Sequence, residues 1–328
     1  MWSGNRTWVT EFIFLSFTDI PEMQVLLFLL FSALFIVILL GNISIMVLVK
    51  SDRCLHSPMY FFLATLSFCE FWYTCSVVPK MLANFLVKNP TISVIGCAFQ
   101  IFFFIGLGSA DCFLLAVMSY DRYVAICNPL HYRTVMNMGL CCKLVAGSLV
   151  FGFLLSLELA ILIVLLPFCG DNHIQHFFCE IPVVLTLACT DTSVHEAAVF
   201  IVCMLVLTIP FLLICVSYTF IISTVVRIQS AQGRHKAFST CTSHLTVVLL
   251  QYGVASFTYL RPKSLHAPEQ DRLISLVYVF GTPLLNPLIY TLRNKEIKAA
   301  LRKGLTIKGK AGTRETLRVA SQRSIQEG

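Results

Sequence analysis

Long runs of apolar residues, broken by short polar segments, dominate the chain from about residue 24 to residue 292. Each run is about 20 residues or longer, the length that an α-helix needs to cross the hydrocarbon core of a bilayer. The runs do not alternate polar and apolar positions over about ten residues, as the strands of a membrane barrel do. The pattern predicts seven membrane-spanning helices, near 24–49, 58–86, 95–127, 140–167, 196–226, 237–260 and 271–292.

Three short segments lie outside these runs. Residues 1–23 precede the first span, and a basic stretch, 293–305, follows the last one. The apolar positions of this stretch recur at helical spacing, which predicts a short amphipathic helix on anionic lipid. Residues 306–328 are polar and are expected to form a cytoplasmic tail. The predicted fold class is an all-α membrane protein, a seven-helix bundle over 24–292 with a short amphipathic helix after the last span.

Composition and charge agree with this fold class. Hydrophobic residues make up 57% of the chain and charged residues 12%, about half the charged share of an ordinary soluble domain. The net charge of +7 does not indicate nucleic acid, because 18 of the 24 lysines and arginines fall on one side of the predicted bundle. Basic residues favour the cytoplasmic side, so we expect an outer N-terminus and a cytoplasmic C-terminus in the plasma membrane. Asn5, in an Asn-Arg-Thr sequon, is then a glycosylation candidate.

Fourteen cysteines are present, and most of them fall inside spans or on the cytoplasmic side, where reduced thiols are expected. Four lie on the outer side, and four cysteines allow three pairings. Of these we favour Cys97–Cys179, which would tie the third span to the long loop after the fourth span. Cys169–Cys189 would then close that loop on itself.

The same loop allows a second interpretation. His173, His176 and Cys179 stand close together in the segment "HIQHFFCE" and could ligate a metal ion. An oxidising compartment favours disulfide formation by such a cysteine, so we rank the metal site below the disulfide.

Several motifs occur in order along the chain: "GN" in the first span, "LHSPMYFFLATLSF" at the second, "MSYDRYVAICNPLHY" at the end of the third, "KAFSTCTSHL" at the sixth and "PLLNPLIYTLRNK" in the seventh. Together they resemble the olfactory receptors, rhodopsin-like (class A) G-protein-coupled receptors, from about residue 11 to 303. The resemblance implies a receptor rather than an enzyme. It implies that a small, mostly apolar odorant binds within the bundle and that a stimulatory heterotrimeric G protein is activated, raising cyclic AMP.

The resemblance also implies a G-protein switch at the cytoplasmic end of the third span. Arg122 would pair with Asp121 at rest and be released on activation, within a motif that also contains Tyr123. Tyr218 of the fifth span and Tyr290 of the seventh would swing toward the arginine. The surroundings of the G-protein cavity would include His131, Tyr132 and residues 236–244.

Helix geometry places key residues of the third span on one face. At 100° per residue, Asp111 lies within about 20° of Arg122, Phe104 lies on the same face, and Cys97 is about 20° away. The outer half of this face is therefore a candidate wall for a ligand pocket. Apolar residues at helical spacing are often only packing, so the set carries more weight than any single member. The candidate pocket residues are Phe104, Ile105, Gly108, Ser109, Val202, Cys203, Val206, Tyr252, Ala255, Ser256 and Tyr259.

Two acids stand in otherwise apolar spans. A carboxylate in such a run is costly, so Glu70 and Asp111 need partners. By resemblance, Glu70 would lie near Asn286 of the seventh span, with Asp111 and Asn42 as neighbours. Two acids so close cannot both stay ionised unless a cation or proton lies between them. We expect a sodium- or proton-holding site there and no other cofactor or metal; a single protonated glutamate is the alternative.

Other function classes fit less well. A transporter or channel could use Glu70 and Asp111 for permeation, but the chain has no inverted repeat or pair of broken helices. An amine receptor would be expected to place an acid in the outer half of the third span, where this chain has Phe104 and Ile105. The role of Glu158 in the fourth span stays open, and Gln251 in the sixth could face lipid, a neighbouring helix or the pocket rim.

Overall fold

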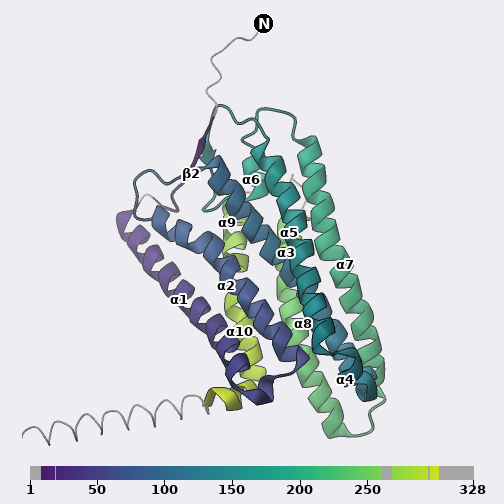
Figure 1. Cartoon of the computed structure of the whole chain (residues 1–328). Coiled ribbons are helices and arrows are strands. Elements are labelled where there is room, and N and C mark those ends of the chain that lie inside the picture. The colour runs from purple at the N-terminus through teal and green to yellow at the C-terminus, as the bar shows by residue number, and fades with distance from the viewer. Residues whose placement is uncertain (1–8, 19, 261–267, 295, 303–328) are drawn as a thin grey trace, which may run out of the picture.

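Seven helical segments run side by side along the length of the molecule (Figure 1). The computed structural model describes residues 9–18, 20–260, 268–294 and 296–302. The seven segments are α1 (Pro21–Ser51), α2 (Pro58–Asn84), α3 (Val94–Cys127), α5 (Met138–Val164), α7 (Ser193–Val226), α8 (Ala231–Tyr259) and a composite of α9 (Pro268–Leu276), η4 (Val277–Gly281) and α10 (Thr282–Arg293).

Six of these segments are long and apolar enough to cross a membrane, with mean hydropathies from 1.4 to 3.1. The remaining segment, α8, begins with a polar stretch of about two turns, "AQGRHKAF", ahead of its apolar part. This stretch starts six residues before the expected span at 237, because Ser230 caps the helix by accepting a hydrogen bond from the Gly233 amide. The prediction of an all-α seven-helix membrane bundle is confirmed.

Helix α3 is the centre of the bundle. Of its apolar stretch 67% is buried inside the protein, against 11% for α1 at the periphery. Helix α5 packs against α3 closely enough that a Cβ on Gly152 would lie 2.6 Å from the Gly106 carbonyl oxygen. In the same seam the Ser156 hydroxyl donates to the Phe102 carbonyl oxygen, at 2.5 Å. Small residues let membrane helices approach in this way, so this contact holds α3 in position.

The seventh span is not a uniform α-helix. It contains a π-helical turn, η4, directly before Pro283 in the first turn of α10. A proline lacks an amide hydrogen, so the backbone adjusts on its N-terminal side, and π turns often occur at such points. Pro283 and Pro287 therefore do not end the span, and the irregularity is a local change of helix type within it.

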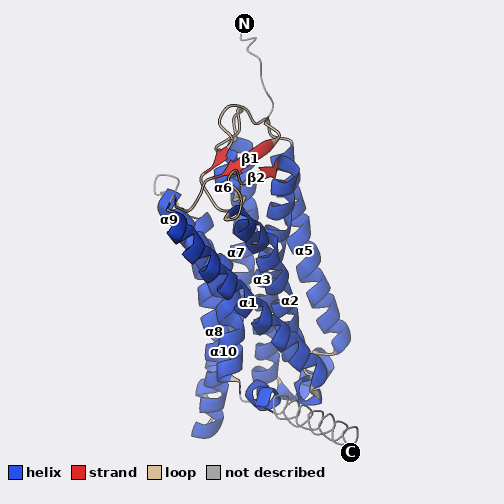
Figure 2. Cartoon of the chain, turned by 90° about the vertical axis from the view of Figure 1, so that its left-hand side faces the viewer, coloured by secondary structure: helices blue, strands red, loops and turns tan. Residues whose placement is uncertain are grey.

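A small sheet covers the upper end of the bundle, and the sequence analysis had not predicted it (Figure 2). Strand β1 (Glu11–Phe14) lies in the middle, antiparallel to β2 (Thr91–Ser93) and parallel to β3 (His173–Ile174). Its Phe12 and Phe14 side chains are buried. We call this three-stranded sheet the cap. Part of the expected N-terminal tail is thus ordered, as one strand of the cap.

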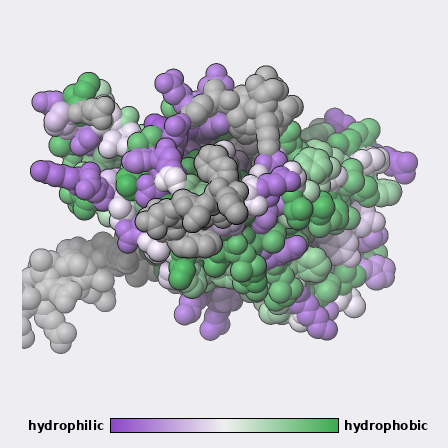
Figure 3. Space-filling view, turned by 90° about the horizontal axis from the view of Figure 1, so that it is seen from above, coloured by the Kyte–Doolittle hydropathy of each residue, from purple (hydrophilic) through white to green (hydrophobic). Residues whose placement is uncertain are grey.

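The loop between α5 and α7 completes this upper end with the short helix α6 (Ile181–Leu185). Seen from above, hydrophilic side chains are scattered over the cap, and apolar side chains cover much of the flanks around it (Figure 3).

The lower end carries the other short connections. They are η1 (Arg53–Leu55), η2 (Pro129–His131) and α4 (Tyr132–Val135). After α10, residues 296–302 are helical, within the predicted amphipathic segment. Ile297 and Ala300 are buried against the bundle, and Tyr60 donates to the Glu296 carboxylate at 2.6 Å. The predicted tail 306–328 and Asn5 lie outside the described residues.

Candidate functional site

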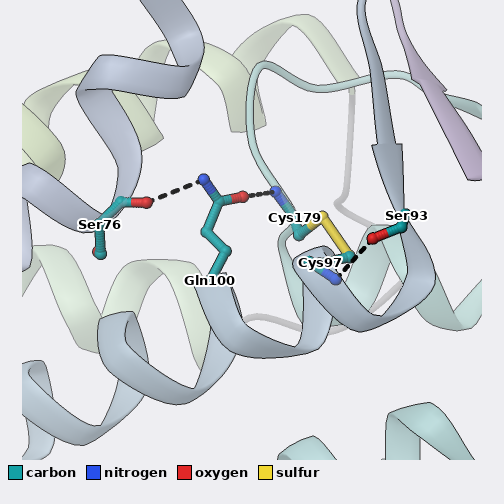
Figure 4. The surroundings of a disulfide bond; sticks show 6 residues. Ser76, Ser93, Cys97, Gln100 and Cys179 are labelled. Carbon is teal, nitrogen blue, oxygen red and sulfur yellow. Dashed lines mark hydrogen bonds between the residues drawn. A yellow bond between two sulfur atoms is a disulfide. The ribbon is translucent and has the colours of Figure 1, made fainter.

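Two disulfides fix the loop above the bundle. The structure contains Cys97–Cys179, from the start of α3 to the loop, and Cys169–Cys189 within the loop. Beside the first bond, Gln100 accepts from the Cys179 amide at 2.8 Å and donates to the Ser76 carbonyl oxygen at 3.0 Å (Figure 4). This buried glutamine joins α2, α3 and the loop, and its role had not been predicted.

The metal interpretation of this loop does not fit the structure. Cys179 is oxidised, and His173 contacts the Asp171 carboxylate at 2.5 Å instead of approaching His176 or the cysteine. Both residues are exposed, and the hydrogen bond from His173 lowers the pKa of Asp171. In the described residues, no group of three His, Cys, Asp or Glu side chains is arranged to hold a metal ion.

A cavity of about 80 Å³ lies inside the bundle, beneath the loop. Its walls come from α2, α3, α5, α6, α7, α8 and the seventh span, so a small ligand there would contact side chains of most of the bundle. The lining residues are Tyr73, Phe104, Ile105, Gly108, Ser109, Cys112, Leu159, Ile181, Val199, Val202, Cys203, Val206, Leu207, Gln251, Ala255, Tyr259 and Tyr278.

Nine of the eleven candidate pocket residues line this cavity. The exceptions are Ser256 and Tyr252; the Tyr252 hydroxyl donates to the Cys112 carbonyl oxygen at 2.9 Å and so ties α8 to α3. Gln251, whose direction was left open, is one of the lining residues. The sequence analysis missed Tyr73 and Tyr278, because helical spacing on α3, α7 and α8 says nothing about which residues α2 and the seventh span bring in.

A larger cavity of about 310 Å³ lies at the upper rim, between the end of β1, α2 and the connection to β2. It is a gap beneath the cap, lined by residues such as Phe17, Phe85 and Lys88. We consider the inner cavity the better ligand site although it is smaller, because seven elements converge on it. It also lies next to a group of buried polar side chains at the middle of the bundle, around Asp111 of α3, which we call the polar centre.

That polar centre contains Glu70 and Asn286, which lie in hydrogen-bond contact, the amide of Asn286 donating to the Glu70 carboxylate. Asp111 is close enough to interact electrostatically with Glu70. Asn42 donates to the carbonyl oxygens of Ile38 and Pro283, at 3.1 and 3.2 Å. The structure thus brings α1, α2, α3 and the seventh span together at this level.

This centre also has a surplus of acceptors. Four buried side-chain oxygens there, one each on Asn42, Glu70, Asp111 and Asn286, have no hydrogen-bond partner in the part of the chain that the structure describes. Unsatisfied buried acceptors are costly, and a proton or a small hard cation is the species that such oxygens would bind.

At the lower end, the predicted switch residues fall at one level of the bundle. Arg122 and Asp121 are both buried, and Asp121 accepts from the Tyr132 hydroxyl at 2.8 Å. The Tyr290 hydroxyl is buried and has no hydrogen-bond partner among the described residues. Tyr132, the first residue of α4, had been placed only near the G-protein cavity; it is a direct partner of Asp121.

Tyr218 has a partner that the sequence analysis did not identify. Its hydroxyl lies 2.9 Å from Nδ1 of His244, whose Nε2 lies 3.1 Å from the Leu115 carbonyl oxygen. A carbonyl only accepts, so Nε2 carries the proton and Tyr218 donates to Nδ1. This chain of hydrogen bonds links α7, α8 and α3.

A further buried acid, Glu180, lies in the loop just above the cavity. It accepts from the Tyr278 hydroxyl at 2.8 Å and from Ser275 at 3.4 Å, and His176 lies 3.1 Å away. Burial raises the pKa of Glu180 to about 7 and lowers that of His176 to about 3. The sequence analysis did not single out this cluster, because a loop acid looks solvated until the seventh span covers it.

Glu158, the unexplained acid of the fourth span, is exposed on the surface of α5 that faces away from the bundle. It therefore does not reach the cavity. The hydroxyl of Ser156, two residues before it, donates to the Phe102 carbonyl oxygen.

Comparison with known proteins agrees with this arrangement. The family model described as "Olfactory receptor" matches residues 31–308. The human protein "Olfactory receptor 10Q1" is 55% identical over 302 residues, covering 92% of this chain and 95% of its own length. Human "Olfactory receptor 10V1" is 53% identical, covering 92% of this chain and 98% of its own. These relatives are receptors, not enzymes. The chain belongs to the olfactory receptor family of class A G-protein-coupled receptors, which are multi-pass membrane proteins.

Proposed function

We propose that this receptor binds a small, mostly apolar odorant in the inner cavity and activates a stimulatory G protein, which raises cyclic AMP. One observation carries the proposal: helix α3 lines the cavity with Phe104 and Ser109 and carries the buried residues Asp121 and Arg122 in its last turns. A rigid central helix that joins a ligand cavity to a switch can pass a change from one to the other.

The contacts at the lower end support a two-state switch. In the structure, Tyr218 is held by His244, and His244 is held by the backbone of α3. Opening the lower end by moving α8 outward would break these bonds and free Tyr218 to approach Arg122. A ligand that prefers the open arrangement would shift the population toward it.

The second part of the proposal concerns the buried acids. Glu70, Asp111 and Asn286 would hold a sodium ion or a proton, with Asn42 as a neighbour, and thereby stabilise the resting bundle. The four unpartnered oxygens support this site, because a bound cation would satisfy them. When bound, the cation neutralises the paired carboxylates; the residues themselves hold α2, α3 and the seventh span together.

For orientation, we propose an outer N-terminus and a cytoplasmic C-terminus in the plasma membrane. The distribution of lysine and arginine supports it, and so do the disulfides, which form on the oxidising side. The apolar flanks would contact lipid tails, and the helix at residues 296–302 would lie on the cytoplasmic surface.

The test is an odorant panel on cells that express the chain together with a cyclic-AMP reporter. Arg122→Gln should abolish the odorant response while surface expression stays at the wild-type level. Arg133→Gln removes a positive charge from an exposed residue near the same end and should leave the response intact. A surface-expressed wild-type receptor that never raises cyclic AMP would overturn the proposal, and a signalling Arg122→Gln variant would overturn the switch.

A further inference from the structure

The hydrogen bonds at the upper end of the cavity determine where one particular proton lies. Tyr278 lines the cavity, and its hydroxyl donates to Oε1 of Glu180 at 2.8 Å. A phenol has one proton and can also accept through its oxygen. With that proton committed to Glu180, Tyr278 can offer a cavity ligand only an acceptor.

The environment of Glu180 allows this direction in both of its charge states. Its other oxygen, Oε2, lies 3.1 Å from Nε2 of His176 and 3.4 Å from the Ser275 hydroxyl. As a carboxylate, Glu180 accepts on both oxygens. As a neutral acid, it can carry its proton on Oε2 and donate to the unprotonated His176 nitrogen, while Oε1 still accepts from Tyr278.

Tyr259 also lines the cavity. Because the Tyr278 proton points to Glu180, the Tyr278 oxygen can only accept, whether from Tyr259 or from a ligand. A ligand that meets Tyr278 therefore finds an oxygen lone pair and no proton.

We infer that the outer end of the cavity selects ligands that carry a hydrogen-bond donor, such as alcohols and phenols, over ligands of the same size that only accept, such as ethers. This inference rests on the proposed odorant site and assigns the selecting role to Tyr278, positioned by Glu180. An ether oxygen placed there would face a second acceptor and lose the hydrogen bond that it had with water.

The rest of the cavity wall fits such a ligand. Phe104, Ile105, Val202 and Val206 offer apolar contacts for a hydrocarbon body. Apolar contacts depend on shape and not on the donor, so they contribute equally to an alcohol and to its isomeric ether. Other polar side chains of the cavity, such as Ser109 and Gln251, stay in place when Tyr278 is changed to Phe, so the change in the alcohol-to-ether ratio in that variant reports on Tyr278.

The experiment uses isomeric pairs that differ in the donor alone. Suitable probes are heptan-1-ol with 1-methoxyhexane and 2-phenylethanol with benzyl methyl ether, within a panel of C5–C9 alcohols and their isomeric ethers. Cyclic-AMP responses of surface-expressed receptor are measured for each pair. We expect the alcohols to be about tenfold more potent than their ethers, the effect of about one hydrogen bond.

Four variants separate the selecting role from a structural one. Tyr278→Phe should reduce the alcohol-to-ether ratio to about one, by weakening the alcohols. Glu180→Leu frees the tyrosine proton and should lower the ratio by strengthening the ethers. Glu180→Gln keeps an acceptor oxygen and should retain the ratio. Thr219→Val removes a hydroxyl from an exposed residue of α7 outside the cavity, and should also retain it.

Each outcome decides between the alternatives. Equal potency within pairs on the wild-type receptor would overturn the donor preference while leaving the odorant site intact. An unchanged ratio in Tyr278→Phe would overturn the assignment to Tyr278, even if Glu180→Leu fails to reach the surface. A receptor that answers no alcohol and no ether, but answers other odorants, would also overturn the preference. Silence toward every odorant would overturn the proposed function itself.

Discussion

At the scale of single residues, the loop cluster shows how burial and charge oppose each other. Glu180 and His176 are both fully enclosed, and they lie 3.1 Å apart. Burial favours the neutral form of each group, so it raises the pKa of the acid and lowers that of the histidine. Asp271 and Arg272 of α9 also act on the cluster: Asp271 raises the pKa of Glu180, and Arg272 lowers that of His176.

The two shifts predict opposite pH dependences of stability. The pKa of Glu180 rises from 4.5 to about 7, so between these values the folded state binds more protons than the unfolded state, and stability falls as pH rises. The pKa of His176 falls from 6.5 to about 3, so between these values the unfolded state binds more protons, and stability rises with pH. From pH 4.5 to 6.5 the two effects cancel.

Single variants should therefore reveal each effect. As pH falls from 6.5 to 4.5, wild type should lose stability relative to His176→Phe by about 1.4 kcal/mol per pH unit. As pH falls from 7 to 4.5, it should gain stability relative to Glu180→Gln by a similar slope. Thermal unfolding of the detergent-solubilised receptor from pH 4.5 to 8 measures both. Parallel curves for all three proteins would show that these groups do not titrate as assigned.

At the scale of secondary-structure elements, the contact between α3 and α5 sets the position of the central helix. Gly152 faces the backbone of α3, where a Cβ would also lie 2.9 Å from the Ala110 amide nitrogen. A helix backbone cannot move aside as a flexible side chain can, so even one methyl group here must separate the helices.

We expect Gly152→Ala to destabilise the receptor by about 1–3 kcal/mol, the usual cost of overpacking. The matched control is Gly147→Ala on the same helix, where an added Cβ meets nothing within 4 Å. Because alanine favours helix over glycine by about 1 kcal/mol, the control should be neutral or more stable. Melting temperature and surface expression measure both variants. Equal behaviour would mean that the seam is looser than described.

The elements also show what sequence alone can predict. The seven spans and the α3 face were predictable, because run length and the 100° turn per residue are local properties of the chain. Strand β1 was not, because four residues carry little pattern and its partners lie about 80 and 160 residues away. The role of Glu180 could not be predicted either, since its burial depends on Ser275 and Tyr278 of the seventh span.

At the scale of the whole molecule, the buried acids join helices that are far apart in sequence. Asn286 is 216 residues from Glu70, and Asn42 is 241 residues from its partner Pro283. A change at this centre therefore acts on α1, α2, α3 and the seventh span together. Any species held there would bias the resting and active arrangements of the bundle as a whole.

We expect Glu70→Gln and Asp111→Asn each to change basal cyclic-AMP signalling and to remove its dependence on sodium, because each variant removes one of the two carboxylates that would hold the ion. Basal reporter activity of permeabilised cells at matched ionic strength, with sodium replaced by potassium, measures this. Glu158→Gln is the control, since it neutralises an exposed acid of another span. If neither buried variant differs from this control, the acids do not form a shared site.

The three-stranded cap can form completely only after residues far apart in the sequence have been synthesised. Strand β1 is made first, but its partner His173 follows Ile13 by 160 residues. At about 5–20 residues per second, the strand waits roughly 8–32 s during synthesis before the sheet can close. The loop residues that pack on this strand, Phe168 beside Phe12 and Ile174 beside Phe14, are made only near the end of that time. The first of the three strands to be synthesised is thus among the last segments to become fully packed. A chaperone or quality-control factor could engage the chain during that interval.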